Sequence, residues 1–409
     1  MRALNTPAPA GSGASPGLAL GATLAIQIYT SLAGAAAAVL APAIAADLGV
    51  PARWIGAYVG LVYAGAMSAS LVCGAWIARH GAIRVSQACV ALCAGGVALT
   101  ALAGPGGLAL VAFAAFGLGL GYGPITPASS QILARTTPPS RMSLVFSIKQ
   151  TGVPAGTALA GAALPAVALM WGWRAAFAAV AIIGAAVILA AQPIRRGLDT
   201  GLRRDADVAI GRAFTAVAQL MRDARIAPLV LLSFAYAATQ VSLTSFLVVH
   251  LTGVLGWSLV GAGFALSAGT VGGVAGRIAW GALSDRTHAP RAVLGALGVA
   301  AGLCATLLAF ATAGWPDLAV YAIVVAFGAT AIGWNGVMLA EVARLAPAGE
   351  AASITGTAGV VTFSGVVVGP TLFAALSAAA GTTRAGFAAA ALLSGVSGAV
   401  MLVRRHAGR

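Results

Sequence analysis

Charged side chains are scarce in this chain of 409 residues: Asp, Glu, Lys and Arg make up 8% of it, whereas apolar residues make up 60%. A soluble domain carries roughly 25% charged residues. This chain therefore has too little polar surface to face water. Its composition excludes an ordinary soluble protein and indicates that lipid is its solvent.

Acids and lysine are the scarcest of these charges. The chain has nine Asp and Glu residues and a single lysine, Lys149, beside 22 arginines. None of the acids lies near the centre of a long apolar segment, where a buried cation would need one as a partner. This absence argues against a pocket for a cationic substrate and against the usual carboxylate proton relay. It leaves proton symport open, because a substrate's own carboxylate can carry the proton.

Catalytic and metal-binding patterns are also missing. The four cysteines lie in apolar segments and are expected to be buried thiols. No group of His, Cys and Asp has the spacing of metal ligands, and no nucleophile has a base nearby in sequence. We therefore expect no enzyme activity, no metal and no cofactor. A sensor without transport activity stays an alternative, although no added signalling domain is visible.

Long apolar runs fill most of the remaining sequence, and each has at least the ~17 residues that a helix needs to cross a bilayer. Their length favours helices over strands. The sequence thus predicts an all-α integral membrane protein with twelve transmembrane helices, at about 18–44, 54–78, 85–103, 107–133, 143–169, 174–192, 227–252, 258–283, 292–313, 318–343, 352–379 and 385–403.

The arginines predict the orientation in the membrane. With both termini placed in the cytoplasm, 18 arginines fall on the cytoplasmic side and three, Arg53, Arg174 and Arg384, fall outside. Such an excess is typical of cytoplasmic loops. The net charge of +14 thus needs no nucleic-acid partner. We expect a multipass protein of the cytoplasmic (inner) membrane.

Polar stretches divide the chain into five parts. Residues 1–17 are rich in Pro, Ala, Gly and Ser and are expected to be a disordered cytoplasmic tail. Residues 193–226 read as a cytoplasmic connector between two six-helix bundles, 18–192 and 227–404, and residues 405–409 form a second cytoplasmic tail.

The two halves resemble each other. "GAWIARHGAIR" from Gly74 matches "GALSDRTHAPR" from Gly281, and "SIKQTG" from Ser147 matches "SITGTAG" from Ser353, at nearly the same offset. Twelve helices in a 6 + 6 parallel repeat, with G-x-L-x-D-R after the eighth helix, resemble the major facilitator superfamily. The resemblance implies two bundles that rock about a central site.

The repeated loop motif supplies the candidate latch residues. The resemblance implies that the acid of this motif helps to close the cytoplasmic side. Asp285 is expected to accept bonds from a helix N-terminus of the other half, or to pair with Arg344. The first copy has Ala78 where an acid would stand. The candidate latch residues are Gly74, Arg79, Arg84, Gly281, Asp285, Arg286 and Arg291.

Two features of the family's antiporter branches are missing or incomplete. The fourth segment carries no arginine, and "GVPAG" in the fifth is only a partial match to G-P-x-x-G-G. Both departures weaken the alternative of a proton-coupled exporter of drugs or other amphipathic compounds.

Lys149 is the first candidate for a ligand contact. A lysine near the centre of a membrane helix costs roughly 2.5–3.5 kcal/mol, and snorkelling to the headgroups is the alternative role. Gly152, Gly156 and Ala160 continue along its helix face, and such small residues suit contact with a helix or a cavity better than contact with lipid. Pro154 cannot donate to the Gln150 carbonyl, so it frees an acceptor and permits a hinge.

The other candidate pocket residues are polar or aromatic and lie near mid-membrane. Arg277 resembles the eighth-helix arginine of organic-anion and monocarboxylate branches, with snorkelling or a latch contact as alternatives. The family assigns helices one, four, seven and ten to the central cavity. The substrate-binding candidates are Lys149, Gln150, Gln27, Tyr29, Tyr122, Tyr236, Gln240, Trp334, Asn335 and Arg277.

These observations predict a secondary active transporter for a small organic solute, in particular an anion such as a carboxylate. Proton symport and anion exchange both fit. The expected partners are this solute and the lipid bilayer, and the expected assembly is a monomer.

Overall fold

The computed structural model describes residues 15–50, 55–203 and 210–406, and every regular element in this part of the chain is helical. In the first half these are α1 (Pro16–Val39), α2 (Ala41–Leu48), α3 (Ile55–His80), α4 (Ala82–Ala101), α5 (Leu108–Tyr122), α6 (Ile125–Thr136), the 3₁₀ turn η2 (Pro139–Arg141), α7 (Met142–Gln150), α8 (Gly152–Trp171) and α9 (Trp173–Ala191). The connector contains α10 (Arg195–Leu198) and α11 (Ile210–Arg222). The second half contains α12 (Ala227–Gly253), α13 (Leu259–Thr287), α14 (Pro290–Phe310), α15 (Asp317–Ala331), α16 (Asn335–Leu345), α17 (Ala351–Ala380) and α18 (Thr383–His406).

The prediction of twelve membrane-crossing helices is confirmed. Eleven helices or joined helix pairs are long and apolar enough to span a bilayer. The twelfth span is α13, which has 29 residues but is glycine-rich and contains Arg277. Four predicted spans are broken into two consecutive helices each: α1 and α2, α5 and α6, α7 and α8, and α15 and α16.

Local sequence explains where these helices start and break. α1 begins at Pro16, two residues before the predicted boundary, because the Ser15 side chain caps it by accepting from the Leu18 N–H at 3.2 Å. Gly123 and Pro124 separate α5 from α6. Residues 1–14 of the predicted N-terminal tail, and residues 407–409 of the C-terminal tail, lie outside the described residues.

Each half packs around its own apolar core. One core joins α1 to α9 with neighbouring helices, and two others fill the second half. A fourth, smaller cluster crosses between the halves, where Phe146 and Met142 of α7 meet Ala340 and Ala343 of α16. The halves therefore have separate cores and meet where α3, α6 and α7 contact α13, α16 and α17.

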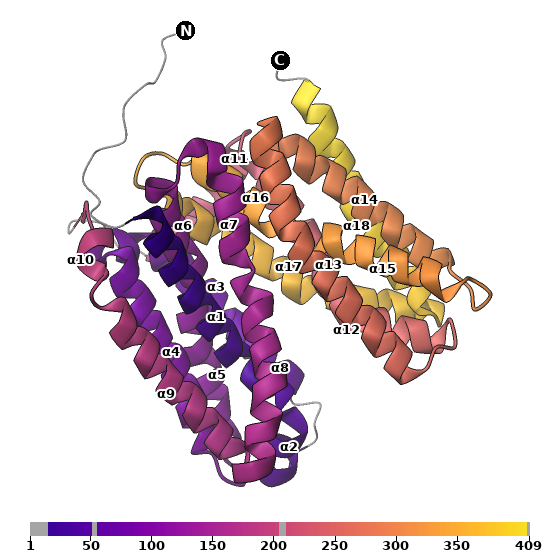
Figure 1. The fold of residues 1–409 in the computed structure, drawn as a ribbon, viewed down its shortest axis with the longest axis horizontal. Coiled ribbons are helices and arrows are strands. Elements are labelled where there is room, and N and C mark those ends of the chain that lie inside the picture. The colour runs from indigo at the N-terminus through magenta and orange to yellow at the C-terminus, as the bar shows by residue number, and fades with distance from the viewer. Residues whose placement is uncertain (1–14, 51–54, 204–209, 407–409) are drawn as a thin grey trace.

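This contact lies at the end of the molecule that carries both copies of the loop motif, which we call the motif end. α1 begins and α18 ends on this side, and from it the two halves diverge (Figure 1). Hydrogen bonds join the halves between the motif end and the middle of the helices. The structure is thus closed at the motif end.

Repeat-related glycines make this closure possible. A Cβ on Gly74 of α3 would lie 2.5 Å from Ser353 Cα of α17. A Cβ on Gly281 of α13 would lie 2.6 Å from Ser147 Oγ of α7. Each glycine lets a helix of one half approach a helix of the other, as small residues do in membrane helix pairs.

The glycine contacts predict that Gly281→Ala opens the motif end. Cys73 is a native reporter, because its thiol is buried and a Cβ on Gly356, in the other half, would lie 2.5 Å from it. We expect faster maleimide alkylation of Cys73 in Gly281→Ala, with Cys89, Cys93 and Cys304 replaced by alanine.

Gly263→Ala is the matched control for this experiment. Gly263 lies on the same helix, and a Cβ there would meet nothing within 4 Å. Both substitutions should stabilise the helix by the same amount, about 1 kcal/mol, because alanine favours the helix more than glycine does. Equal alkylation in the two variants would show that the Gly281 contact does not hold the motif end closed.

Candidate functional site

Lys149 lies at the end of α7 with its ammonium group inside the protein. Only 1% of the residue is exposed. Its Nζ donates to Gln27 Oε1 at 2.7 Å, to Gln150 Oε1 at 3.0 Å and to Thr126 Oγ1 at 3.4 Å. In this conformation Lys149 does not snorkel to the end of its helix, and all three of these acceptors are uncharged.

The small residues after Lys149 bring it to this position. Gly152 packs against Gln27, where an added Cβ would lie 3.0 Å from the glutamine side chain. Gly156 packs against the backbone of α1, where an added Cβ would lie 2.2 Å from the Ile28 carbonyl oxygen. This face of α8 therefore contacts α1 rather than lipid, and it sets Lys149 beside Gln27.

Arg277 is the second buried cation, with 2% of the residue exposed. It lies on α13 in the other half. Its Nη1 donates to the main-chain carbonyl of Gln150, and its Nε donates to the Ile332 carbonyl at 3.1 Å. Gln150 thus accepts from both cations, from Lys149 on its side chain and from Arg277 on its backbone.

Each carbonyl that holds Arg277 lies at a helix break. Gln150 is the last residue of α7, and Pro154, four residues later, has no N–H to donate to it. Ile332 follows the last residue of α15, at the break before α16. Broken helices provide such free polar groups within a membrane where they line a site. Pro154 thus stands beside a real helix break.

A cavity of about 80 Å³ lies between the halves beside these groups. Gln150 and Thr126, both partners of Lys149, are part of its wall, and so are Trp334 and Asn335. Lys149 does not line the cavity itself, but its ammonium group donates to two of these lining residues, Gln150 and Thr126. Residues of α3, α6, α7, α16 and α17 form the wall of the cavity, and its other lining residues are Ser70, Gly123, Pro127, Met338, Leu339, Thr355, Ala358, Gly359, Thr362 and Phe363.

Gln240 of α12 positions the two lining residues of the tenth span. Its Oε1 accepts from Trp334 Nε1 at 3.2 Å and from Asn335 Nδ2 at 3.1 Å. Gln240 therefore orients the cavity wall in the second half, much as Gln27 holds Lys149 in the first.

The repeat-related tyrosines do not join this cluster. The Tyr29 hydroxyl points to Gly184 of α9, where an added Cβ would lie 2.3 Å from it, and has no hydrogen-bond partner. The Tyr236 hydroxyl donates to the Leu294 carbonyl of α14 at 2.7 Å. Both rings pack within their own half, because glycines on the neighbouring helices make room there. The expectation that both tyrosines line the cavity is therefore corrected.

Tyr122 and Tyr236 do not line the cavity, but the ring of each lies beside an aromatic ring that does. The Tyr122 ring centroid is 6.4 Å from that of Phe363, which lines the cavity from the other half. The Tyr236 ring makes an edge contact with the indole ring of Trp334, with the ring centroids 5.6 Å apart.

Asp285 ties the halves together at the motif end. Its two carboxylate oxygens accept from the N–H groups of Ser143 at 3.0 Å and Leu144 at 2.8 Å, in the first turn of α7. A carboxylate at a helix N-terminus also interacts favourably with the helix dipole. Of the two expected partners, the helix N-terminus holds Asp285, whereas Arg344 pairs with Glu341 instead.

The arginines of the motif form an ion pair within their own half or lie on its surface. Arg291 Nε pairs with Glu341 at 3.1 Å. Arg79, Arg84 and Arg286 have exposed side chains at the motif end. Near Ala78, where the first copy lacks an acid, the connector supplies Asp199, which accepts from the N–H groups of Ile83 at 2.7 Å and Arg84 at 3.0 Å.

Sequence reasoning missed three contributors: Thr126, Gln131 and Asp199. Gln131 joins the halves, because its Nε2 donates to the Gly349 carbonyl at 3.1 Å and its Oε1 accepts from the Ala352 N–H at 3.1 Å. A polar residue on the fourth span was the available signal for Thr126 and Gln131. Nothing in the sequence indicated that Asp199 contacts the first motif copy.

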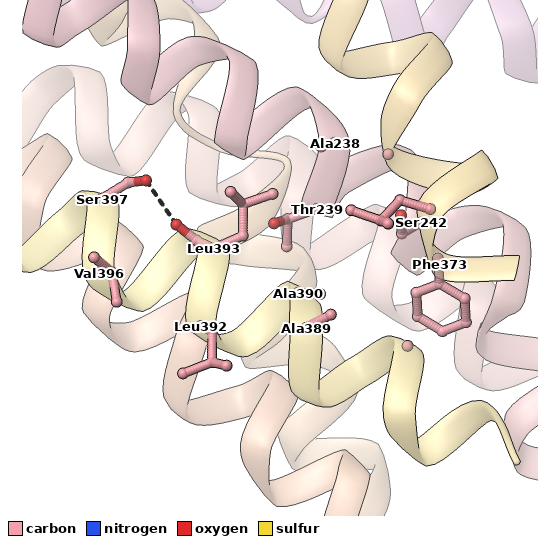
Figure 2. Close-up of a pocket in the computed structure, with 13 residues that line it drawn as sticks. Ala238, Thr239, Ser242, Phe373, Ala389, Ala390, Leu392, Leu393, Val396 and Ser397 are labelled. Atoms are coloured by element: carbon pink, nitrogen blue, oxygen red, sulfur yellow. Dashed lines mark hydrogen bonds between the residues drawn. The ribbon is translucent and has the colours of Figure 1, made fainter. Parts of the chain in front are cut away.

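A larger cavity, of about 430 Å³, lies within the second half between α12, α17 and α18. Figure 2 shows Thr239, Ser242 and Phe373 on one side of it and Leu392, Leu393 and Val396 on the other. All of its lining residues are uncharged, and Leu392 and Val396 are exposed on the outside of the bundle. None of its lining residues is a hydrogen-bond partner of Lys149 or Arg277, so we do not assign it to the site.

Known proteins share the sequence pattern and the fold. The sequence profile of the Major Facilitator Superfamily matches residues 23–370. A variant of the fucose:proton symporter FucP of E. coli superposes with a TM-score of 0.74 at 16% identity, over 96% of this chain and 99% of that one. No curated protein sequence matches the chain.

Two further solved structures resemble this chain to a comparable degree. The human organic anion transporter MFSD10 superposes with a TM-score of 0.70 at 16% identity, over 94% of this chain and 97% of that one. A bacterial homologue of the iron transporter ferroportin, in an outward-facing state, superposes with a TM-score of 0.71 at 18% identity, over 94% and 100%. At these identities the likeness shows the fold.

The Asp285 contact predicts that Asp285→Asn loosens the motif end. Asparagine keeps one acceptor oxygen but loses the second oxygen and the charge, and hydrogen bonds to charged groups contribute ~1.5–3 kcal/mol. We expect about a tenfold rise in the alkylation rate of Cys73. Asp317→Asn, an exposed acid at the start of α15, is the control. Unchanged alkylation in Asp285→Asn would contradict a latch role.

Proposed function

Because the chain belongs to the Major Facilitator Superfamily, whose members are transporters, we propose that it carries a small organic anion, such as a carboxylate, across the membrane. The two halves would expose the central cavity to each side in turn. Lys149 supplies the main positive charge for the anion and Arg277 the second.

One observation carries this proposal: two cations are buried between the halves and both donate to Gln150, and no acid among the described residues pairs with either. Among the ion pairs formed by described residues, none involves Lys149 or Arg277. Burying a charge without an opposite partner costs several kcal/mol, so such residues within membranes usually serve a substrate or an ion. A bound anion is the partner that fits both.

The size of the cavity supports a small solute. Pockets for drug-sized ligands have volumes of roughly 300–1,000 Å³, whereas this cavity measures about 80 Å³ in the closed arrangement. Gln150, Asn335 and Thr126 place an amide or hydroxyl on its wall, and these groups would orient the polar part of the solute. This favours a short carboxylate over export of drugs or other amphipathic compounds.

From the arginine distribution we infer that the motif end faces the cytoplasm. The closed motif end then corresponds to a carrier that is open to the outside. In this proposal both termini are cytoplasmic, the protein acts as a monomer in the inner membrane, and either proton symport or anion exchange drives the solute. The neighbours in fold include proteins named as a proton symporter and as an organic anion transporter, which is compatible with both routes.

A thermal-shift screen of the purified protein tests the proposal. We expect stabilisation by small carboxylates such as acetate or lactate, by about 2.7 kcal/mol at a concentration near 100 Kd. Cations and neutral amphiphiles should give none. Lys149→Ala should remove the response, because the anion loses its main charge partner.

Arg225→Gln is the control, because it removes a positive charge from an exposed position and should leave the response intact. Stabilisation by cations or neutral amphiphiles alone, with no effect of Lys149→Ala, would overturn the anion proposal.

A further inference from the structure

The two buried cations come from opposite halves of the molecule. Lys149 lies on α7 and Arg277 on α13, and both are buried where the two halves meet. Two like charges in a medium of low dielectric constant repel each other strongly. Some group must therefore offset this repulsion where the halves meet.

Gln150 is the residue that contacts both charges. Its side-chain Oε1 accepts from Lys149 Nζ at 3.0 Å, while its carbonyl oxygen accepts from Arg277 Nη1. It presents two oxygens to two cations, as a carboxylate would. It also lines the cavity, so a bound anion would compete for the same donors.

The backbone oxygen is available only because of the local sequence. In a regular helix the N–H of residue 154 would donate to it, but residue 154 is proline. The helix accordingly ends at Gln150 and starts again at Gly152. The proline thus keeps the Gln150 carbonyl free for the guanidinium of the other half.

We infer that Gln150 is an internal substitute for the anion, which lets the empty carrier close by giving Lys149 and Arg277 a shared, uncharged partner. A bound anion displaces these contacts and takes over the same two cations. The empty carrier can then change conformation without solute, so net transport becomes possible and obligatory exchange is not required. This inference rests on the proposed function, because it assigns the two cations to an anion.

Two substitutions of Gln150 should act in opposite directions. Gln150→Leu keeps the size of the side chain but removes Oε1, so the empty carrier should open and Cys73 alkylation should rise about tenfold. Gln150→Glu places a permanent carboxylate between the cations. It should slow alkylation below the wild-type rate and raise the melting temperature in the absence of any added anion.

Added anions give a readout that a purely structural role would not change. Sodium acetate, lactate and nitrate at equal ionic strength serve as probes. An anion that stabilises the wild type should restore protection of Cys73 in Gln150→Leu and should have no effect on Gln150→Glu. Gln192→Leu, which removes an amide from another part of the first half, should behave as the wild type.

A backbone variant tests the inference if Gln150→Leu does not fold. Pro154→Ala supplies the missing N–H, which competes with Arg277 for the Gln150 carbonyl, so alkylation of Cys73 should rise. Pro165→Ala is the matched control, because Pro165 lies within the same helix α8 but far along it from Gln150.

The possible failures can be told apart. If Gln150→Glu and Gln150→Leu shift alkylation in the same direction, or neither shifts it, the internal-substitute role is wrong, even where Lys149→Ala abolishes stabilisation by anions. If no anion stabilises the wild type but the two variants shift alkylation in opposite directions, Gln150 still bridges the two cations, but the proposed function fails and with it the substitution for an anion.

Discussion

The rest of this structure depends on the hydrogen bonds that Gln150 accepts from two buried cations. Lys149 and Arg277 belong to different halves, and both would be unfavourable in a membrane without oxygen partners. The helix break before Pro154, the small-residue face against α1 and the break between α15 and α16 all serve to bring oxygens to these charges. The polar centre of the protein is therefore organised around positive charge.

The two halves share a fold but divide the work unequally. At the motif end, both motif copies have a glycine that allows close contact between the halves. Only the second copy has an acid, Asp285, whose carboxylate accepts hydrogen bonds from the other half. In the first copy the connector's Asp199 binds within its own half. At the centre, Lys149 has Thr355 as its counterpart. Closure and charge recognition thus depend on departures from the repeat.

Much of this architecture could be predicted from the sequence. Segment length fixes the helices, because every backbone group in lipid must be satisfied within its own segment. The scarcity of acids and the position of Lys149 pointed to an anion, and Pro154 pointed to a free Gln150 carbonyl. The partner of that carbonyl, Arg277, could not be predicted, because it comes from a helix more than a hundred residues away. Tyr29 and Tyr236 were misplaced for a similar reason, since helix rotation depends on glycines of neighbouring helices.

The central claim is that Lys149 and Arg277 hold an anion, and a structure with a brominated short carboxylate tests it most directly. The account predicts bromine density in the central cavity, a carboxylate oxygen within hydrogen-bond distance of Lys149 Nζ, and the Gln150 side chain turned away from it. Bromine bound elsewhere, with Lys149 still held by Gln27, Thr126 and Gln150, would contradict the account.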